Sequence, residues 1–156
     1  MINIVPENIT NGIADLLQND LPAILTTIET EKADGVSLPA LKIIDKGYAD
    51  IFNRPKYPAC GIQVDTVRIE SAGQNAMKYD TDVSVVIALA DLKPDVLNIK
   101  AMRYAEAVRE VIQRNASLNN SCLYSHVSNI EFYPAAPGDK YMSIIDVTIN
   151  AMDEIN

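Results

Sequence analysis

One stretch of the sequence, Asp80 to Arg114, constrains the fold more than any other. Its first part is apolar at alternate positions, namely Val83, Val85, Ile87 and Leu89. This period of two predicts a strand with one buried face. A helix is expected from Pro94 onward, because seven apolar residues there fall within an arc of roughly 120° at 100° per residue. They are Leu97, Ala101, Tyr104, Ala105, Val108, Val111 and Ile112. The strand and the helix can cover each other and form the predicted centre of the fold.

Two helices are predicted before this unit. The first begins at Pro6-Glu7 and carries an apolar face of Ile9, Ile13, Leu16 and Leu17. Asp20 would interrupt that face, so a second helix is expected there, with Asp20 as its N-cap and Pro22 in its first turn. Asp34-Gly35 is expected to end it. The stretch from Val36 to Lys56 has the weakest periodicity and is expected to be a long irregular connection with room for one short strand.

Three further strands are predicted. The first, Ala59 to Glu70, changes its apolar phase at Asp65-Thr66, which indicates either a β-bulge or burial on opposite faces. The turn 71–75 joins it to the strand through Val83. Cys122 to Tyr133 carries Val127, Ile130 and Phe132, and a turn at Pro134 to Asp139 leads to a last strand, Tyr141 to Met152. One face of this last strand carries Ile145, Val147, Ile149 and Ala151.

The predicted order is therefore αα–loop–ββ–α–ββ in one domain of residues 1–156. This order favours an α+β fold, with a central, mostly antiparallel sheet of at least four strands and helices packed mainly on one face.

The charge balance limits the partners. Thirteen basic and 21 acidic residues give a formal net charge of −8. Tight nucleic-acid binding neutralises phosphates with Lys and Arg, so no specific nucleic-acid binding is expected. No apolar run approaches the roughly 18 residues of a membrane span, and the N-terminal residues lack the features of a signal peptide. A protein made in the cytoplasm, without membrane association, is expected.

Few residues in the sequence suggest catalysis. Cys60 and Cys122 lie in separate predicted strands, and His126 is the single histidine. No spacing typical of a zinc site, a phosphate-binding loop or a nucleophile elbow occurs. Asp80 and Asp82 share one strand face and could hold a cation, but a solvated strand end is favoured because two ligands are too few. No enzyme activity, cofactor or metal is expected.

Two apolar residues fall outside the stripe of the central helix. Ile99 and Met102 lie about 100–180° from its centre, and they need a second cover unless they are scattered surface residues. The N-terminal helices are expected to use their own apolar faces on the sheet. A neighbouring subunit is therefore the favoured cover.

The segment Tyr57-Pro58-Ala59-Cys60-Gly61-Ile62, together with the strand–helix unit around Ala88-Leu89-Ala90, resembles the tail terminator family of tailed bacteriophages, also called tail-completion or tail-to-head joining proteins. The resemblance covers most of the chain through the order of its elements. It implies a virion structural protein that forms a homo-oligomeric ring, expected to be a hexamer, on the head-proximal end of the tail tube. The implied partners are the tail tube and head connector proteins.

Such a ring would place some residues between subunits. Besides Ile99 and Met102, the expected interface residues are Tyr57, before the first long strand, and Gln74 and Asn75 in the hairpin turn. Two other readings stay open. One is another phage head–tail connector or tail tube component, and the other is a small-molecule-binding regulatory α+β domain.

Overall fold

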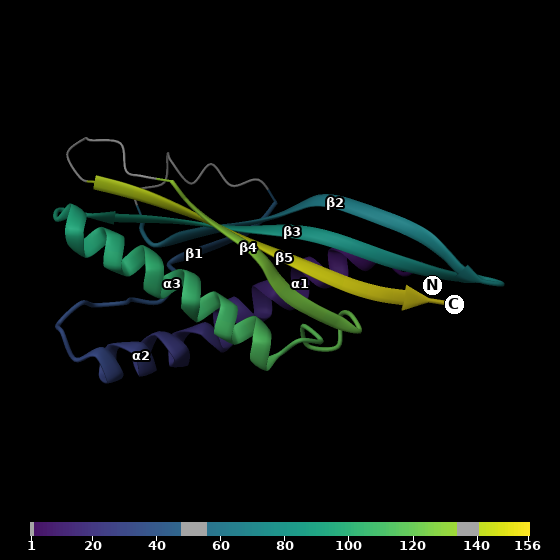
Figure 1. Cartoon of the computed structure of the whole chain (residues 1–156), viewed down its shortest axis with the longest axis horizontal. Coiled ribbons are helices and arrows are strands. Elements are labelled where there is room, and N and C mark those ends of the chain that lie inside the picture. The colour runs from purple at the N-terminus through teal and green to yellow at the C-terminus, as the bar shows by residue number, and fades with distance from the viewer. Residues whose placement is uncertain (1, 48–55, 134–140) are drawn as a thin grey trace.

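The computed structural model describes residues 2–47, 56–133 and 141–156 (Figure 1). The predicted turn at Pro134 to Asp139 and the middle of the Val36–Lys56 connection lie outside these ranges. The elements follow one another as α1 (Val5–Asn19), α2 (Leu21–Lys32), β1 (Ile43–Lys46), β2 (Ala59–Gly73), β3 (Ala76–Asp91), α3 (Pro94–Arg114), β4 (Tyr124–Tyr133) and β5 (Tyr141–Ile155). The predicted α+β class is confirmed, and β1 is the short strand for which the connection left room.

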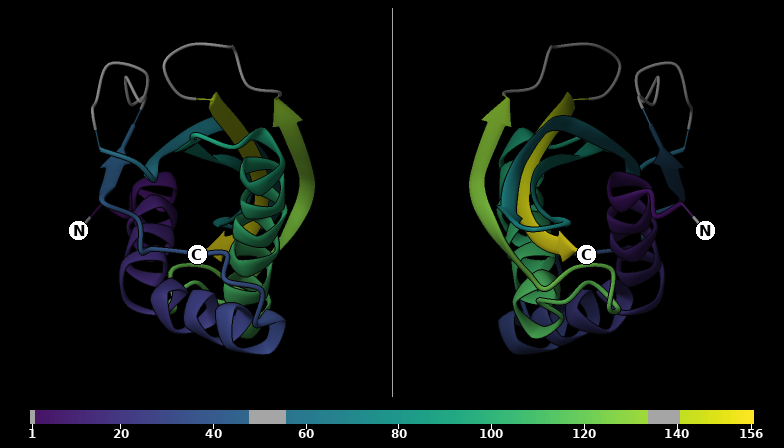
Figure 2. Two further views of the ribbon diagram at one scale, coloured as in Figure 1. Left: turned by 90° about the vertical axis from the view of Figure 1, so that its left-hand side faces the viewer. Right: turned by 90° about the vertical axis from the view of Figure 1, so that its right-hand side faces the viewer.

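The described strands form one open sheet in the order β1-β2-β3-β5-β4. β1 is parallel to β2, and every other neighbouring pair is antiparallel. Because β5 lies between β3 and β4, these two strands run in the same direction, with α3 connecting them. The three helices lie on one side of the sheet, as Figures 1 and 2 show.

The core lies between the sheet and these helices. The alternate residues predicted in β3 are buried there, and they pair in register with Ile149, Val147, Ile145 and Ser143 of β5. All seven residues of the predicted α3 stripe are buried against them. α1 packs against β1, β2 and β3, whereas α2 contacts α1 and α3. The expectation that both N-terminal helices pack on the sheet is wrong for α2, because α3 already covers that part of it.

The phase change in β2 is a β-bulge. The pairing of β2 with β3 slips by one residue between Val64 and Thr66. Val64 pairs with Val83, and Val67 pairs with Thr81, so both valines face the helix side. A second slip, between Val127 and Asn129, does the same in β4. Phe132 pairs with Ile145 on the helix side but is 48% exposed, because β4 is an edge strand.

The turn between α3 and β4 packs closely on α1. Leu118 is fully buried in this turn, although its φ is 50°, and Asn119 and Asn120 also have positive φ. Gly12 of α1 permits the approach, since a Cβ there would lie 2.4 Å from the Leu118 carbonyl oxygen and 2.4 Å from Ser121 Oγ. Asp20 precedes α2 as expected, but its side chain makes no capping hydrogen bond.

Candidate functional site

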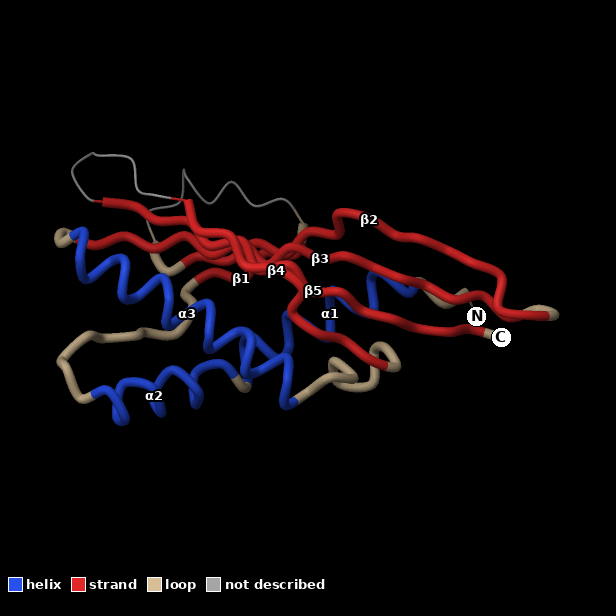
Figure 3. The backbone as a smooth tube through the Cα atoms, in the orientation of Figure 1, coloured by secondary structure: helices blue, strands red, loops and turns tan. Residues whose placement is uncertain are grey.

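One end of the sheet extends beyond the helices. We call this part the arm and define it as residues 66–73 of β2, 76–82 of β3 and 150–155 of β5. Figure 3 shows these strands continuing past the N-terminal end of α1. The turn at Gln74 and Asn75 forms the tip, where Gly73 and Asn75 adopt positive φ values of 135° and 63°. The strand pattern therefore continues where the helical cover has ended.

The helix-side face of the arm is apolar and partly open to solvent. Met77 pairs with Ile155, and Ile69 pairs with Tyr79, in the same register that places Val83 in the core. Ile69 is 51% exposed and Met77 is 42% exposed. Tyr79 and Ile155 are half-buried at the margin of the core. At Ile69 and Met77 this face resembles the core in composition but is open to solvent.

The opposite face of the arm carries a polar network. Arg68 Nε donates to Asp80 Oδ2 at 3.0 Å, and its Nη2 donates to Asp82 Oδ2 at 2.9 Å. Asn150 Nδ2 donates to Asp82 Oδ1 at 2.9 Å and also reaches Asp80. The hydrogen bond from Arg68, aided by that from Asn150, lowers the pKa of Asp80 against the opposing effect of desolvation.

This network corrects the reading of Asp80 and Asp82 as a solvated strand end. Their carboxylates face one another across Arg68, and the guanidinium occupies the position that a cation would need. In the described ranges, no group of three His, Cys, Asp or Glu residues could hold a metal ion.

The residues expected at a subunit interface do not form one surface. Gln74 and Asn75 are exposed at the arm tip. Tyr57 is half-buried at the far end of β2, where it packs against the paired Ala59 and Ala88 on the face away from the helices. Their role at an interface stays a prediction.

Ile99 and Met102 lie on a third surface, on α3. Met102 is 47% exposed and Ile99 is half-buried. On its α2 side, α3 is further tied to the N-terminal region by the Arg103–Asp34 ion pair and by the hydrogen bond from Tyr104 Oη to the Pro39 carbonyl. A neighbouring subunit was expected to cover Ile99 and Met102 because α2 was expected to pack on the sheet. Since α2 packs on α1 and α3 instead, that argument for a neighbouring subunit fails. Their place in an interface stays a prediction.

The two cysteines are free and buried. Desolvation, with a smaller contribution from Asp45, raises the pKa of Cys60 to about 12. Desolvation, with a smaller contribution from Asp153, raises the pKa of Cys122 to about 11. Both thiols are therefore protonated at neutral pH, which disfavours nucleophilic attack. His126 is exposed on β4 and stacks on Tyr124 with ring centroids 5.8 Å apart.

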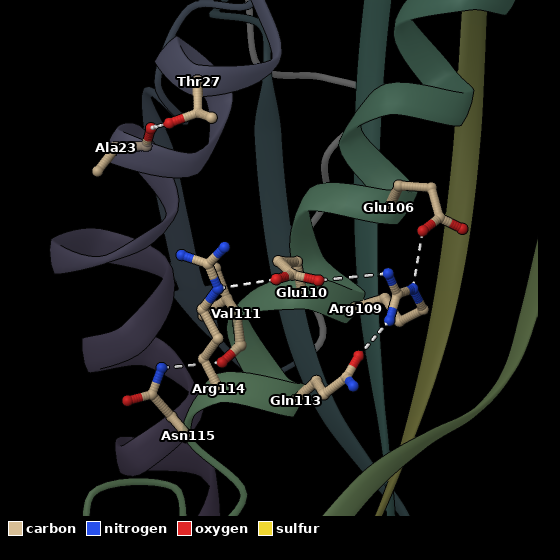
Figure 4. A network of polar contacts seen from close by, with 9 residues as sticks. All are labelled: Ala23, Thr27, Glu106, Arg109, Glu110, Val111, Gln113, Arg114 and Asn115. Atoms are coloured by element: carbon tan, nitrogen blue, oxygen red, sulfur yellow. Dashed lines mark hydrogen bonds and ion pairs between the residues drawn. The ribbon is translucent and has the colours of Figure 1, made fainter. Parts of the chain in front are cut away.

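The arginines of the described chain are all engaged in ion pairs. Figure 4 shows Arg109 between Glu106 and Glu110, and Arg114 on the other oxygen of Glu110. Arg103 pairs with Asp34, and Arg68 lies in the arm network. In the described chain, the positive charge that remains for an outside partner is therefore carried by lysines.

Three of these lysines lie near β1. We call residues 41–47, together with Lys56, the β1 edge. The backbone N–H of Lys42 donates to the Pro58 carbonyl oxygen at 2.9 Å, two residues after Lys56 in the sequence. Lys46 Nζ donates to Asn11 Oδ1 at 2.9 Å. In the described ranges, none of the three forms an ion pair.

Shallow grooves occur in the described surface. One of about 450 Å³ lies next to the β1 edge and is lined by Pro6, Glu7, Thr10, Asn11, Lys46, Gly47 and Val64. Another of about 340 Å³ lies between α3 and β4, beside Arg109, Tyr124 and His126. Neither the uncovered face of the arm nor the β1 edge was singled out from the sequence. The sequence signal that could have found the uncovered face of the arm is the alternation of apolar residues from Val67 to Tyr79, which continues farther than the predicted helices could cover.

Comparison with known proteins leaves the family open. No helix of the described chain is long and apolar enough to cross a membrane. No protein-family model matches the sequence, and no curated protein is significantly similar to it.

Proposed function

We propose that this chain is a structural subunit of a bacteriophage tail, a tail terminator that assembles into a ring at the head-proximal end of the tail tube. The observation that carries the proposal is the arm. On its helix-side face, Ile69 and Met77 are exposed beyond the N-terminal end of α1. Exposed apolar surface on an otherwise well-packed domain is typical of a surface that another protein covers. The resemblance in the order of elements and in the Tyr57 to Ile62 segment supplies the kind of assembly.

A subunit of this kind acts by its shape. The arm would fix neighbouring subunits, and the ring would end tube growth and offer a surface to the head connector. The function requires no chemical step, and we propose that the chain is not an enzyme. The buried, protonated thiols of Cys60 and Cys122 are consistent with this role.

Electron microscopy of the purified chain is the direct test. We expect closed rings, and we expect these rings to cap one end of tail tubes assembled from the tube protein of the same phage. Tubes that keep growing at both ends after the chain is added would contradict the proposal. A chain that stays monomeric, and whose melting temperature rises with a small molecule, would favour the regulatory binding domain instead.

A further inference from the structure

In the described ranges, no strand pairs with the outer edge of β4. β4 is the last strand in the order β1-β2-β3-β5-β4, and Figure 2 shows it along one margin of the sheet. Edge strands usually avoid pairing with other chains by being short or by carrying proline, lysine or other charged residues. β4 has ten residues, none of them proline, lysine or arginine, and Glu131 is its single acidic residue. Its edge is therefore open to another strand.

The bulge in β4 gives the strand the same order of faces when it is read from either end. The residues that pair with the helix-side row of β5 are Ser125, Val127, Ile130 and Phe132. Those that pair with the opposite row are Tyr124, His126, Asn129, Glu131 and Tyr133. Counted inward from the two ends, the faces therefore match at every position up to the bulge. A regular strand of ten residues lacks this symmetry, because its first and last side chains point to opposite faces.

A second copy turned through 180° can therefore lie antiparallel beside β4 with like faces on the same side. When the alignment centres on Ser128 and Asn129, the opposite residues are Tyr124 with Tyr133, Ser125 with Phe132, His126 with Glu131, and Val127 with Ile130. Each pair occurs twice because the two copies are equivalent. Three of the pairs set like against like or a donor against an acceptor: two aromatic rings, two aliphatic side chains, and an imidazole N–H with a carboxylate. Cross-strand pairs of these kinds stabilise antiparallel sheets.

The polar and aromatic side chains of these pairs are accessible. Tyr124 is 55% exposed and Tyr133 is 47% exposed, at opposite ends of the strand. Glu131 accepts hydrogen bonds from Asn129 Nδ2 at 3.0 Å and from Tyr133 Oη at 2.5 Å. Because an ionised carboxylate offers about four acceptor sites, Glu131 can accept a further hydrogen bond from His126 of a second copy.

We infer that β4 pairs with β4 of a second copy of this chain, antiparallel and about a two-fold axis at Ser128 and Asn129. The sheets of the two copies then join into one, with the helices of both on the same side. Main-chain hydrogen bonds provide the affinity in such strand addition, and the side-chain pairs fix the register. A two-fold contact closes on two chains, so it differs from the contact that builds the proposed ring and goes beyond that function.

A disulfide cross-link tests the alignment. In His126→Cys with Glu131→Cys, each new thiol should lie opposite a new thiol of the second copy. Opposite residues of antiparallel strands have Cα atoms about 4.5–5.5 Å apart, which suits a disulfide. Within one extended strand, positions 126 and 131 lie roughly 16 Å apart, too far to bridge. With oxidised glutathione as the oxidant, we expect a covalent dimer on a denaturing gel without reductant.

His126→Cys with Tyr133→Cys is the matched control for this cross-link. It places two thiols on the same face of β4 but moves one of them two residues out of the alignment. We expect at least roughly tenfold less covalent dimer from the control than from the first variant. The native cysteines are buried and add little to either. Equal cross-linking of the two variants, or none in the first, would overturn the inference.

Two charge variants test the pairing without a covalent bond. Tyr124→Lys with Tyr133→Lys places lysine opposite lysine at both ends of the contact. Tyr124→Glu with Tyr133→Lys places glutamate opposite lysine instead. In sedimentation velocity, we expect the first variant to associate about tenfold more weakly than the second, because like charges directly opposite each other repel. Net charge alone predicts no such loss, since two added lysines bring a chain of net charge −8 closer to neutrality.

His126→Asn is the control for a tolerated change at the contact. It keeps a side-chain N–H opposite Glu131 of the second copy, so it should pair like the wild-type chain. Equal association of the two charge variants, both folded by circular dichroism, would overturn the inference. If either is misfolded, the cross-link decides.

The outcomes separate the inference from the proposed function. A chain that cross-links through β4 but never caps a tail tube leaves the contact standing and removes the function. Rings that cap tail tubes, formed by a chain whose thiols do not cross-link, leave the function standing and overturn the contact.

Discussion

The covered half of the sheet and the arm are built from the same strands, yet they differ in what lies over them. In β3, the alternate residues from Val83 to Leu89 and the residues Met77 and Tyr79 lie on the same face, because the pairing of β3 with β5 continues without a slip. The first group is sealed by α1 and α3, whereas Met77 is 42% exposed. An alternating pattern thus reports which face of a strand is apolar. Whether that face is covered depends on the length of the helices.

The largest expected effect contrasts two isoleucines. Ile87→Ala, in the covered half, should lower the free energy of unfolding by about 2–5 kcal/mol, because it leaves a cavity in the core. Ile69→Ala, in the arm, should cost under about 1 kcal/mol in the dissociated chain, because its side chain is half exposed. Urea unfolding of both variants at a concentration where the chain is monomeric measures the difference. Equal losses would mean that the arm is packed as tightly as the core.

Gly12→Ala tests the close contact of α1 in the covered half. In an exposed helix interior this change would stabilise by about 1 kcal/mol. Here the new methyl group meets the Leu118 carbonyl, so we expect a net loss of about 1–3 kcal/mol. Thermal unfolding measures it, with Asp15→Ala as a control for helix propensity at an exposed position of the same helix. A higher melting temperature would show that the 115–121 turn moves away at little cost.

A smaller effect, opposite in sign between the two regions, is expected from two aspartates. Asp146 lies on the helix-free face of the covered half, and desolvation, together with Asp65 and Glu131, raises its pKa against the opposing hydrogen bond of Ser84. Its ionised form therefore destabilises the fold above that pKa. Asp146→Asn should stabilise the chain at pH 7, and the gain should disappear as the pH falls through the raised pKa.

Asp80→Asn, in the arm, should do the reverse. The pKa of Asp80 is lowered, chiefly by Arg68, so its ionised form stabilises the fold above the ordinary pKa of about 4. The variant should be less stable than the wild-type chain at pH 7, and the loss should vanish as the pH falls through the lowered pKa. Urea unfolding between pH 7 and pH 3 measures both variants. Parallel pH profiles would contradict the assignment of opposite shifts.

The smallest effect on assembly is expected at the residues that a catalytic reading would choose. His126→Asn should change neither stability nor assembly measurably, since the ring is exposed and contacts only the Tyr124 ring among the described interactions. Cys60→Ala should cost roughly 1–2 kcal/mol from lost packing while leaving assembly intact. Sedimentation velocity and thermal melts beside the wild-type chain provide the readout. A folded His126→Asn variant that no longer assembles would contradict the structural role.

Local patterns predicted the elements well where one face was buried by a long partner. The helix from Pro94 and the alternation in β5 follow directly from such burial, and the bulge near Asp65 follows from the change of phase. The pattern could not give the insertion of β5 between β3 and β4, because strand order depends on contacts far apart in sequence. It also missed the exposure of Phe132, whose environment depends on β4 being an edge strand.

The same limit explains the candidate site. Lys42 lies beside Pro58 through the pairing of β1 with β2, across a stretch without periodicity. The expectation for Ile99 and Met102 assumed that α2 packs on the sheet, and only the packed structure shows that it contacts α3. The residue pattern therefore predicted which face of each element is apolar, but only the fold shows which of these faces pack together.

The position of β5 has a consequence for how the chain acquires its fold. β5 is the last strand in sequence, yet it pairs with both β3 and β4. A growing chain that has emerged through β4 holds two strands that share no ladder with each other, and the apolar row of β3 has only β2 beside it. The sheet can close only after residues 141–155 insert between them. Such long-range pairing slows folding and prolongs the exposure of unpaired strand edges, so this protein should be most vulnerable to aggregation until β5 has inserted.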